Sequence, residues 1–258
     1  MKTAIIFIAL QVIYLASAYP YNQFPHSNFN VNSLPYTALP EYFSWRDVPG
    51  VVRPIQYQGQ CGSCFIFASI AAIEGQLSIH FGNHQKLSEQ EMIDCLHDGQ
   101  HYLGCKGGHY SDVFDFARHN GIASAYDYPY NGQQNVCRSQ GLGVHGTHVR
   151  SYVQLPRDEE MIRNALYKQG PLFISFHAPT GFDQHAGGIF SDYYGECQIN
   201  HKRDHTALLI GWGSEGGHDY WIIKNSYGTW WGDAGFFKMT RGVNLCGIAD
   251  DVSYPILY

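Results

Sequence analysis

Seven cysteines constrain the fold of this chain more than any other feature of its sequence. They follow a leader in which Lys2 precedes an apolar run at residues 4–15 and the small residues 16–18, the pattern of a secretory signal peptide. We expect residues 1–18 to be this signal peptide and the chain to follow an oxidising route, on which cysteines form disulfides. Because seven is odd, three disulfides would leave one free thiol. The cysteines stand at positions 61, 64, 95, 105, 137, 197 and 246.

The composition excludes several classes of protein. An apolar content of 45% with only 15% charged residues is too apolar for a disordered chain. The 16 Lys and Arg residues against 22 Asp and Glu residues give a net charge of −6, so no net positive field exists to hold a nucleic acid. After the leader, no apolar run approaches the roughly 20 residues that a membrane span needs. We therefore expect no nucleic-acid partner and no membrane span.

Beyond the leader, the chain changes character at Leu39. Residues 19–38 are rich in Asn, Pro and Tyr and lack helical or strand periodicity, so we expect a short irregular pro-segment or linker. Residues 39–258 are expected to form one large globular unit or two small subdomains that share a core.

Periodicity predicts helices in the first half of this domain and strands in the second. Apolar side chains at 65–81 form one stripe at helical spacing, and a capping box of Ser88 and Glu91 opens a short helix that reaches Cys95. Further helices are expected at 113–119 and 156–167, and strands at 172–176, 206–212, 220–224 and 235–239. The stripe consists of Ile66, Ile70, Ile73, Leu77 and Phe81. The fold class expected is α+β, with a helical lobe, a sheet lobe and a cleft between them.

Cys64 has several interpretations. It lies at the N-terminal end of the predicted helix, where unpaired N–H groups and the helix dipole lower the pKa of a thiol and favour a nucleophilic thiolate. Alternatively, Cys61 and Cys64 form a redox dithiol or half of a zinc site, or Cys64 joins an ordinary disulfide. A Cys61–Cys64 disulfide would leave five cysteines, again an odd number, and a second close pair for zinc is lacking. A free Cys64 satisfies the count.

Three further features make the chain resemble the papain-like cysteine proteases. Cys61-Gly62-Ser63-Cys64 nearly matches their active-site signature, which expects a histidine about 130–150 residues downstream and an asparagine near it. His205 follows Cys64 by 141 residues and Asn225 follows it by 161. The resemblance runs from Leu39 to Leu257, with matching blocks at Trp45-Arg46, Gly104-Cys105-Lys106-Gly107-Gly108 and Gly187-Gly188-Ile189-Phe190.

The resemblance implies a fold and a disulfide pattern. The expected architecture is the papain-like two-lobed fold, with a helical lobe at about 50–145, a β-barrel-like sheet lobe at about 146–258 plus the N-terminal strand, and the active site in the cleft between them. The implied disulfides, Cys61–Cys105, Cys95–Cys137 and Cys197–Cys246, again leave Cys64 free.

The resemblance also implies the catalytic residues, and their chemistry suits the roles. Cys64 would be the nucleophile, His205 would accept its proton and later protonate the leaving amine, and Asn225 would orient the imidazole. The Gln58 side chain and the Cys64 backbone N–H would stabilise the oxyanion. No cofactor and no metal is implied.

Substrate-binding residues follow by position. Asp251 is expected at the bottom of the pocket for the second side chain before the scissile bond, which predicts tolerance of basic residues beside apolar ones; alternatively, Arg203 neutralises it. Asp204 is expected to be structural or to line a subsite. The remaining candidates for substrate binding are Gly107, Gly108, His109 and Ser175. Because no insert resembling an exopeptidase's occluding loop is visible, we expect an endopeptidase.

Three positions or segments depart from the family pattern. Phe65 stands where the family usually has Trp after the nucleophile, and Tyr227 stands where a Trp shields the Asn–His hydrogen bond. Residues 19–38 are shorter than the inhibitory prosegment of relatives, which predicts a chain secreted without an autoinhibited zymogen, or an incomplete or decayed relative.

These observations predict a papain-like cysteine endopeptidase that is secreted, into an extracellular space or gut lumen, or lysosomal. Its expected partners are protein or peptide substrates and proteinaceous cysteine-protease inhibitors, and we expect a monomer. The alternatives are a catalytically weak or inactive peptide-binding homologue on the same scaffold and a thiol–disulfide oxidoreductase that uses Cys61 and Cys64.

Overall fold

A long central helix organises the fold, which we describe from a computed structural model that covers residues 39–96, 103–139, 141–192, 195–199 and 202–258. These residues belong to one structural unit. The predicted signal peptide at 1–18 and the predicted segment at 19–38 lie outside the described residues.

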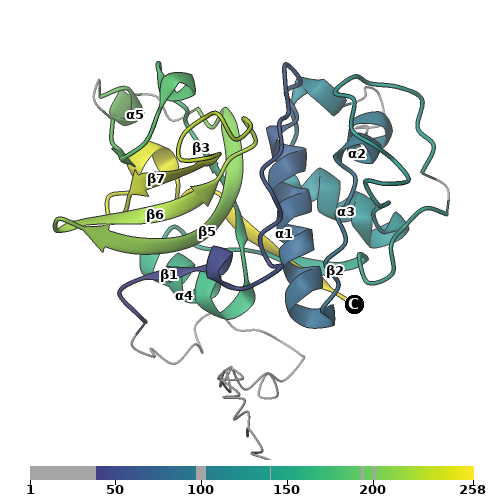
Figure 1. Cartoon of the computed structure of the whole chain (residues 1–258), viewed down its shortest axis with the longest axis horizontal. Coiled ribbons are helices and arrows are strands. Elements are labelled where there is room, and N and C mark those ends of the chain that lie inside the picture. The colour runs from purple at the N-terminus through teal and green to yellow at the C-terminus, as the bar shows by residue number, and fades with distance from the viewer. Residues whose placement is uncertain (1–38, 97–102, 140, 193–194, 200–201) are drawn as a thin grey trace, which may run out of the picture. The chain divides into compact units, whose positions relative to one another are not determined.

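The central helix, α1 (Cys64–Phe81), has the other helices of its lobe on one side and the sheet on the other (Figure 1). Every residue from Phe65 to Ser78 is buried, whereas Phe81 is 47% exposed. The prediction of a single apolar stripe ending at Phe81 is therefore wrong, because α1 contacts α2, α3, β3, β5 and β8. Although α1 is long and apolar enough to cross a membrane, 78% of it is buried inside the fold, as expected for a core helix.

Side-chain caps determine where two of the shorter helices begin. In α2 (Glu89–Cys95), the Ser88 hydroxyl accepts a hydrogen bond from the Glu91 backbone N–H at 3.0 Å. The Glu91 carboxylate accepts from the Ala123 N–H instead of completing the predicted capping box. In α4 (Glu159–Gln169), Asp158 is the N-cap, so this helix begins three residues later than predicted. The remaining longer helix is α3 (Tyr110–Asn120).

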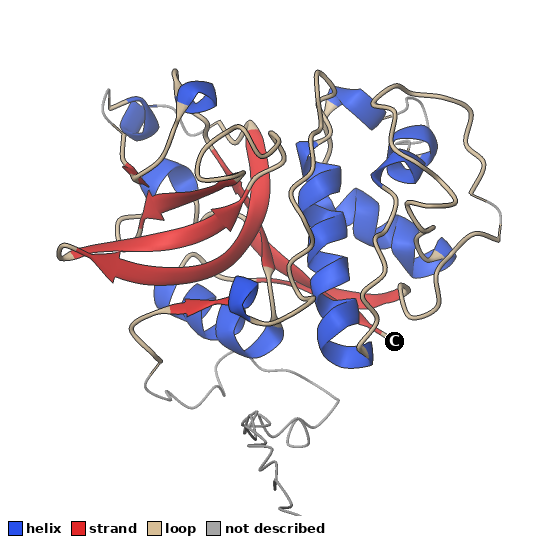
Figure 2. Ribbon diagram, viewed as in Figure 1, coloured by secondary structure: helices blue, strands red, loops and turns tan. Residues whose placement is uncertain are grey.

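Eight strands form one sheet in the order β2-β8-β3-β5-β6-β7-β4, with β1 paired to β5 (Figure 2). The pairs are antiparallel except for β4 with β7. The strands are β1 (Phe43–Ser44), β2 (Val149–Gln154), β3 (Leu172–Phe176), β4 (Ile189–Phe190), β5 (His205–Glu215), β6 (His218–Lys224), β7 (Phe236–Thr240) and β8 (Val252–Leu257). Short elements complete the described chain: η2 (Trp45–Asp47), η3 (Gly104–Lys106), η4 (Phe182–Gln184), α5 (Glu196–Ile199) and η5 (Leu245–Gly247).

This architecture confirms the predicted two-lobed α+β fold class. The four predicted strands correspond to β3, β5, β6 and β7 with small shifts at their ends. Periodicity did not predict the other four strands, of which β1 is the N-terminal one. Of these, β8 contains Pro255, and β2 is half-exposed with an irregular register against β8, so neither shows a clean strand pattern.

The sheet register brings two distant parts of the chain to one end of the β5–β6 pair. His205 is the first residue of β5, and β6 ends at Lys224, which lies opposite Leu208 in β5. Asn225 follows directly, so the antiparallel pairing places it beside the start of β5. The register of this sheet therefore positions His205 next to Asn225.

We predict that Gly211→Ala destabilises the sheet lobe. Gly211 lies at a register shift in β5 opposite Ser44, and an added Cβ would overlap the Phe43 carbonyl oxygen and lie 2.9 Å from the Ser44 Cα. We expect the free energy of unfolding in urea to fall by about 1–3 kcal/mol, since the backbone of β1 has to move. Ser214→Ala, on the exposed part of β5, is the control and should change it by less than about 0.5 kcal/mol. Equal effects would show that contact with β1 is not the cause.

Candidate active site

The loop before α1 holds Cys64 at the first residue of the helix. The Gly62 N–H donates to the Cys105 carbonyl at 3.0 Å, and a Cβ at Gly62 would lie 2.6 Å from that oxygen, so only glycine permits this approach. The Cys61–Cys105 disulfide fastens the same two segments. The loop that precedes Cys64 is therefore held to Cys105 by a hydrogen bond and by a disulfide.

Three disulfides leave Cys64 as the free cysteine. They are Cys61–Cys105, Cys95–Cys137 and Cys197–Cys246, the pairs that the resemblance implies. Because Cys61 is bonded to Cys105, the interpretations of Cys61 and Cys64 as a redox dithiol or as half of a zinc site are wrong. Among the residues that the structure describes, no group of three or more His, Cys, Asp or Glu side chains could hold a metal ion.

His205 has a defined tautomer because its partner is fixed by the backbone. The Asn225 Oδ1 lies 2.8 Å from the His205 Nε2 and also accepts the Ser226 backbone N–H at 2.9 Å. A backbone N–H can only donate, so this atom of Asn225 is an acceptor and the His205 Nε2 must carry a proton. The His205 Nδ1 is left to gain or lose a proton. Both side chains are buried.

Cys64 and His205 form a coupled acid–base pair. Burial is the largest influence on the Cys64 thiol and would raise its pKa. The hydrogen bond to His205 and its charge, with smaller contributions from Thr206, outweigh burial and lower the pKa of Cys64 to about 7. The site can therefore hold a thiolate near neutral pH.

Gln58 is held by four hydrogen bonds to Cys61, Ser226 and Tyr130. Its Nε2 donates to the Cys61 carbonyl at 2.9 Å, and its Oε1 accepts from the Ser226 hydroxyl at 2.6 Å. Its backbone N–H donates to the Ser226 carbonyl, and its own carbonyl accepts from the Tyr130 hydroxyl. An amide nitrogen carries two hydrogens, so one N–H beyond the Cys61 contact can point at a bound group.

Aromatic rings enclose the imidazole of His205. The Tyr227 ring lies 4.8 Å from it, Phe176 5.4 Å and Phe182 5.8 Å, between centroids. The Tyr227 hydroxyl also lies 3.4 Å from the His205 Nδ1, a contact that the sequence did not indicate. Phe65, the other departure from the family pattern, is buried beneath Gly108, where a Cβ would lie 2.6 Å from its ring.

Asp251 contacts two other residues predicted to bind the substrate, His109 and Ser175. Asp251 is 3% exposed, its Oδ2 lies 3.2 Å from the His109 Nε2, and its backbone carbonyl accepts from the Ser175 N–H. The Arg203 guanidinium donates to the Asp250 carbonyl, not to the Asp251 carboxylate. The structure therefore does not pair Arg203 with the Asp251 carboxylate, whose side-chain partner is His109.

Asp204 turns away from the imidazole of its neighbour His205. Its Oδ1 accepts from the Ala178 N–H at 2.8 Å, and its Oδ2 lies 3.1 Å from the His177 Nδ1. These contacts tie Asp204 to the segment at Ala178, and the expectation that it is structural or lines a subsite stays a prediction. His177 was missed because a histidine alone in a strand-ending segment carries no signal of its partner. Gly107, with φ +96°, turns the backbone before Gly108.

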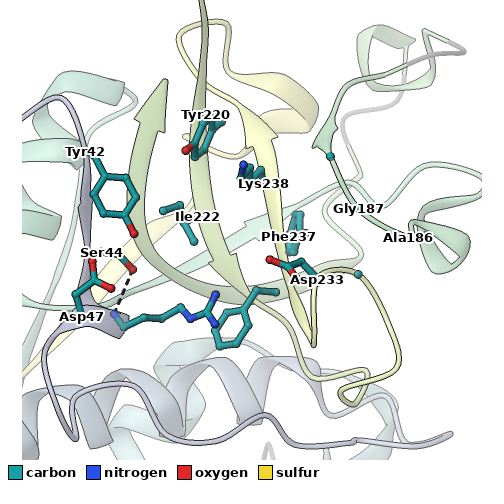
Figure 3. Close-up of a pocket in the computed structure, with 14 residues that line it drawn as sticks. Tyr42, Ser44, Asp47, Ala186, Gly187, Tyr220, Ile222, Asp233, Phe237 and Lys238 are labelled. Carbon is teal, nitrogen blue, oxygen red and sulfur yellow. Dashed lines mark hydrogen bonds between the residues drawn. The ribbon is translucent and has the colours of Figure 1, made fainter. Parts of the chain in front are cut away.

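One hollow in the described residues is not lined by Cys64. It has a volume of about 730 Å³, opens over β6 and β7, and is lined by residues that include Tyr42, Tyr220 and Lys238 (Figure 3). None of the predicted site residues lines it. A much smaller hollow between α1 and the sheet is lined by Thr206 and Asn225 among others, so it adjoins the predicted site.

Comparisons with known proteins identify the family of this chain. The family described as papain family cysteine protease matches residues 39–256. The thiol protease aleurain of Arabidopsis thaliana is 37% identical over 223 residues, which cover 85% of this chain and 61% of that protein. Cysteine proteinase 2 of Zea mays is also 37% identical, with 85% and 61% covered. The chain thus spans about three fifths of the length of these relatives.

Two solved structures are similar. Digestive procathepsin L2 proteinase from the larval midgut of Tenebrio molitor has a TM-score of 0.78 and 37% identity, covering 86% of this chain and 70% of that one. The bromelain protease of Ananas comosus, solved with the E64 inhibitor, has a TM-score of 0.77 and 34% identity, covering 85% and 100%.

We predict that the alkylation rate of Cys64 by iodoacetamide rises with pH around a midpoint of about 7. A lowered pKa means that the thiolate, which is the reactive form, persists to lower pH than in the unfolded chain, where the midpoint should be about 8.5. His205→Ala removes the opposing charge and leaves burial, so its midpoint should lie above that of the unfolded chain. Cys64→Ser, the control, should incorporate no label. A native midpoint at the unfolded value would contradict the coupling.

Proposed function

Because this chain belongs to the papain family of cysteine proteases, we propose that it is an endopeptidase that hydrolyses peptide bonds with Cys64, His205, Asn225 and Gln58. Residues 39–258 would form the peptidase domain. The observation that carries the proposal is the free thiol at the start of α1, coupled to an imidazole whose tautomer is fixed by Asn225. No observation favours the inactive peptide-binding alternative.

The first step is ionisation of the pair. The proton of the Cys64 thiol moves to the His205 Nδ1, which forms a thiolate and an imidazolium. Asn225 Oδ1 keeps the ring aligned through the Nε2 proton, as a carboxylate does in serine triads. The enclosing rings of Phe176 and Phe182 exclude water, which strengthens this hydrogen bond.

The thiolate then attacks the carbonyl carbon of the substrate. The developing oxyanion needs donors that are already oriented, and the free N–H of the Gln58 amide and the Cys64 backbone N–H at the helix start supply them. Because Ser226 and Cys61 hold the Gln58 amide, little reorganisation is needed during reaction.

His205 acts as an acid in the acylation step and as a base in the deacylation step. The His205 Nδ1 proton passes to the leaving amine, which departs and leaves an acyl group on the Cys64 sulfur. The neutral Nδ1 then takes a proton from a water molecule as its oxygen attacks the thioester. Release of the acid restores the thiol and the imidazole.

We also propose where the chain acts and what binds it. The predicted leader and the disulfides support a secreted or lysosomal location, extracellular or in a gut lumen. The partners would be peptide or protein substrates and proteinaceous inhibitors that bind at the substrate site. The chain would act as a monomer. Since the related bromelain was solved with E64, we expect that inhibitor to block this site as well.

The purified full chain should hydrolyse fluorogenic peptides, and Cys64→Ser should abolish turnover. Gln58→Ala removes one oxyanion donor and should lower kcat by about 10²- to 10³-fold with a smaller change in KM. Gln85→Ala, which removes an exposed amide, is the matched control and should leave kcat unchanged. Peptide binding without turnover in a folded wild-type protein would support the peptide-binding alternative.

The Asp251 carboxylate should allow Arg, beside apolar residues such as Leu, as the second residue before the cleaved bond. We expect Asp251→Asn to lower the Arg/Leu ratio of kcat/KM by about tenfold, which corresponds to about 1.4 kcal/mol. Asp250→Asn removes the same charge one residue away, from a carboxylate that contacts Arg157, and serves as the control. If both variants keep the wild-type ratio, Asp251 does not line this pocket.

A further inference from the structure

In the proposed mechanism the His205 Nδ1 exchanges a proton with Cys64. The Tyr227 hydroxyl is a second group that can form a hydrogen bond with this nitrogen. The hydroxyl oxygen lies 3.4 Å from the His205 Nδ1, and the two rings are 4.8 Å apart with an interplanar angle of 39°. The opposite nitrogen, Nε2, already belongs to Asn225 at 2.8 Å. The mechanism proposed above gives Tyr227 no role.

The direction of this hydrogen bond depends on the state of His205. Nε2 carries a proton throughout, so neutral His205 has a lone pair at Nδ1, whereas protonated His205 has an N–H there. Toward the lone pair, the phenol O–H is a stronger donor than the thiol S–H of Cys64. Toward the N–H, the Cys64 thiolate is a charged acceptor and therefore outcompetes the neutral phenol oxygen.

We propose that Tyr227 is a positioning residue whose hydroxyl donates to the His205 Nδ1, holds the imidazole neutral and so opposes formation of the Cys64 thiolate. The inference rests on the proposed function, since it concerns the same pair. When the pair ionises, the proton passes from the Cys64 sulfur to the His205 Nδ1. The Tyr227 phenol keeps its own proton, but Nδ1 no longer has a lone pair that can accept its hydrogen bond.

Burial, together with nearby negative charges, keeps Tyr227 in its donor form. Burial is the largest cause that raises the pKa of Tyr227, and the negative charges of Cys64, Asp183 and Asp204 add to it, bringing the pKa to about 12. Asp183 belongs to η4, Asp204 precedes β5, and Cys64 opens α1; His177 also faces this cluster through its contact with Asp204. The hydroxyl therefore retains its proton at every pH at which the pair titrates.

The test compares the pH dependence of Cys64 alkylation in the full chain, in Tyr227→Phe and in Tyr57→Phe. Tyr227→Phe keeps the ring and removes only the hydroxyl. Tyr57→Phe removes a hydroxyl from a half-exposed ring whose backbone bridges to Tyr227, without a contact to His205. Ultraviolet absorbance of the thiolate, with Cys64→Ser as the blank, provides a second measurement of the same midpoint.

We expect Tyr227→Phe to lower the midpoint by about 0.4 to 1 pH unit, the shift that corresponds to losing one hydrogen bond to the neutral imidazole. One unit below the wild-type midpoint, the variant should react about two to five times faster. Tyr57→Phe should keep the wild-type midpoint. Peptidase activity of Tyr227→Phe should extend to lower pH by a similar amount, which a merely structural role of the ring would not cause.

An unchanged or higher midpoint in Tyr227→Phe would overturn this inference and leave the proposed function intact. A wild-type midpoint near 8.5 that His205→Ala does not move would instead show that Cys64 and His205 form no pair, and would overturn the proposed function itself.

Discussion

The burial of α1 around nearly its whole circumference is the constraint on which the rest of the structure depends. A helix whose residues from Phe65 to Ser78 are all buried needs cover on every side, and neither lobe alone can provide it. Helices α2 and α3 pack against one side, and β3, β5 and β8 against the other. The N-terminal end of α1 consequently lies at the boundary between the lobes. Cys64 occupies that end, which is why its partners come from the sheet.

The sheet meets this helix end with two residues that lie 20 positions apart in the chain. His205 opens β5 and Asn225 follows β6, so the antiparallel register, not a local motif, fixes their 2.8 Å contact. Ser226 extends the arrangement, because it contacts both Asn225 and Gln58. The four side chains proposed for catalysis are thus tied to one another through backbone and side-chain hydrogen bonds. A change in the register of β5 and β6 would separate His205 from Asn225.

Much of the fold and part of the site could be predicted from the sequence. The helical periodicity after Cys64 and the odd number of cysteines indicated a free thiol at a helix start, whereas the roles of His205 and Asn225 came from the family resemblance. Local patterns were insufficient for β2 and β8, since Pro255 and half-exposed positions obscure the alternation of a strand. The contacts of His177 with Asp204 and of Tyr227 with His205 join residues 22 to 27 positions apart, and only the folded register brings these pairs together.

At the loop before α1, two cysteines three residues apart differ in oxidation state, since Cys61 is in a disulfide and Cys64 is a free thiol. Cys61 is bonded to Cys105, whereas Cys64, three residues later, is free and would have to remain a thiol for the nucleophilic role proposed for it. Thiol–disulfide exchange connects both sulfurs to the same surrounding pool of oxidants and reductants. A strongly reducing medium would open the bond that anchors the loop, and a strongly oxidising one would consume the nucleophile. The protein can therefore work only within a window of reduction potential bounded by two cysteines of one loop.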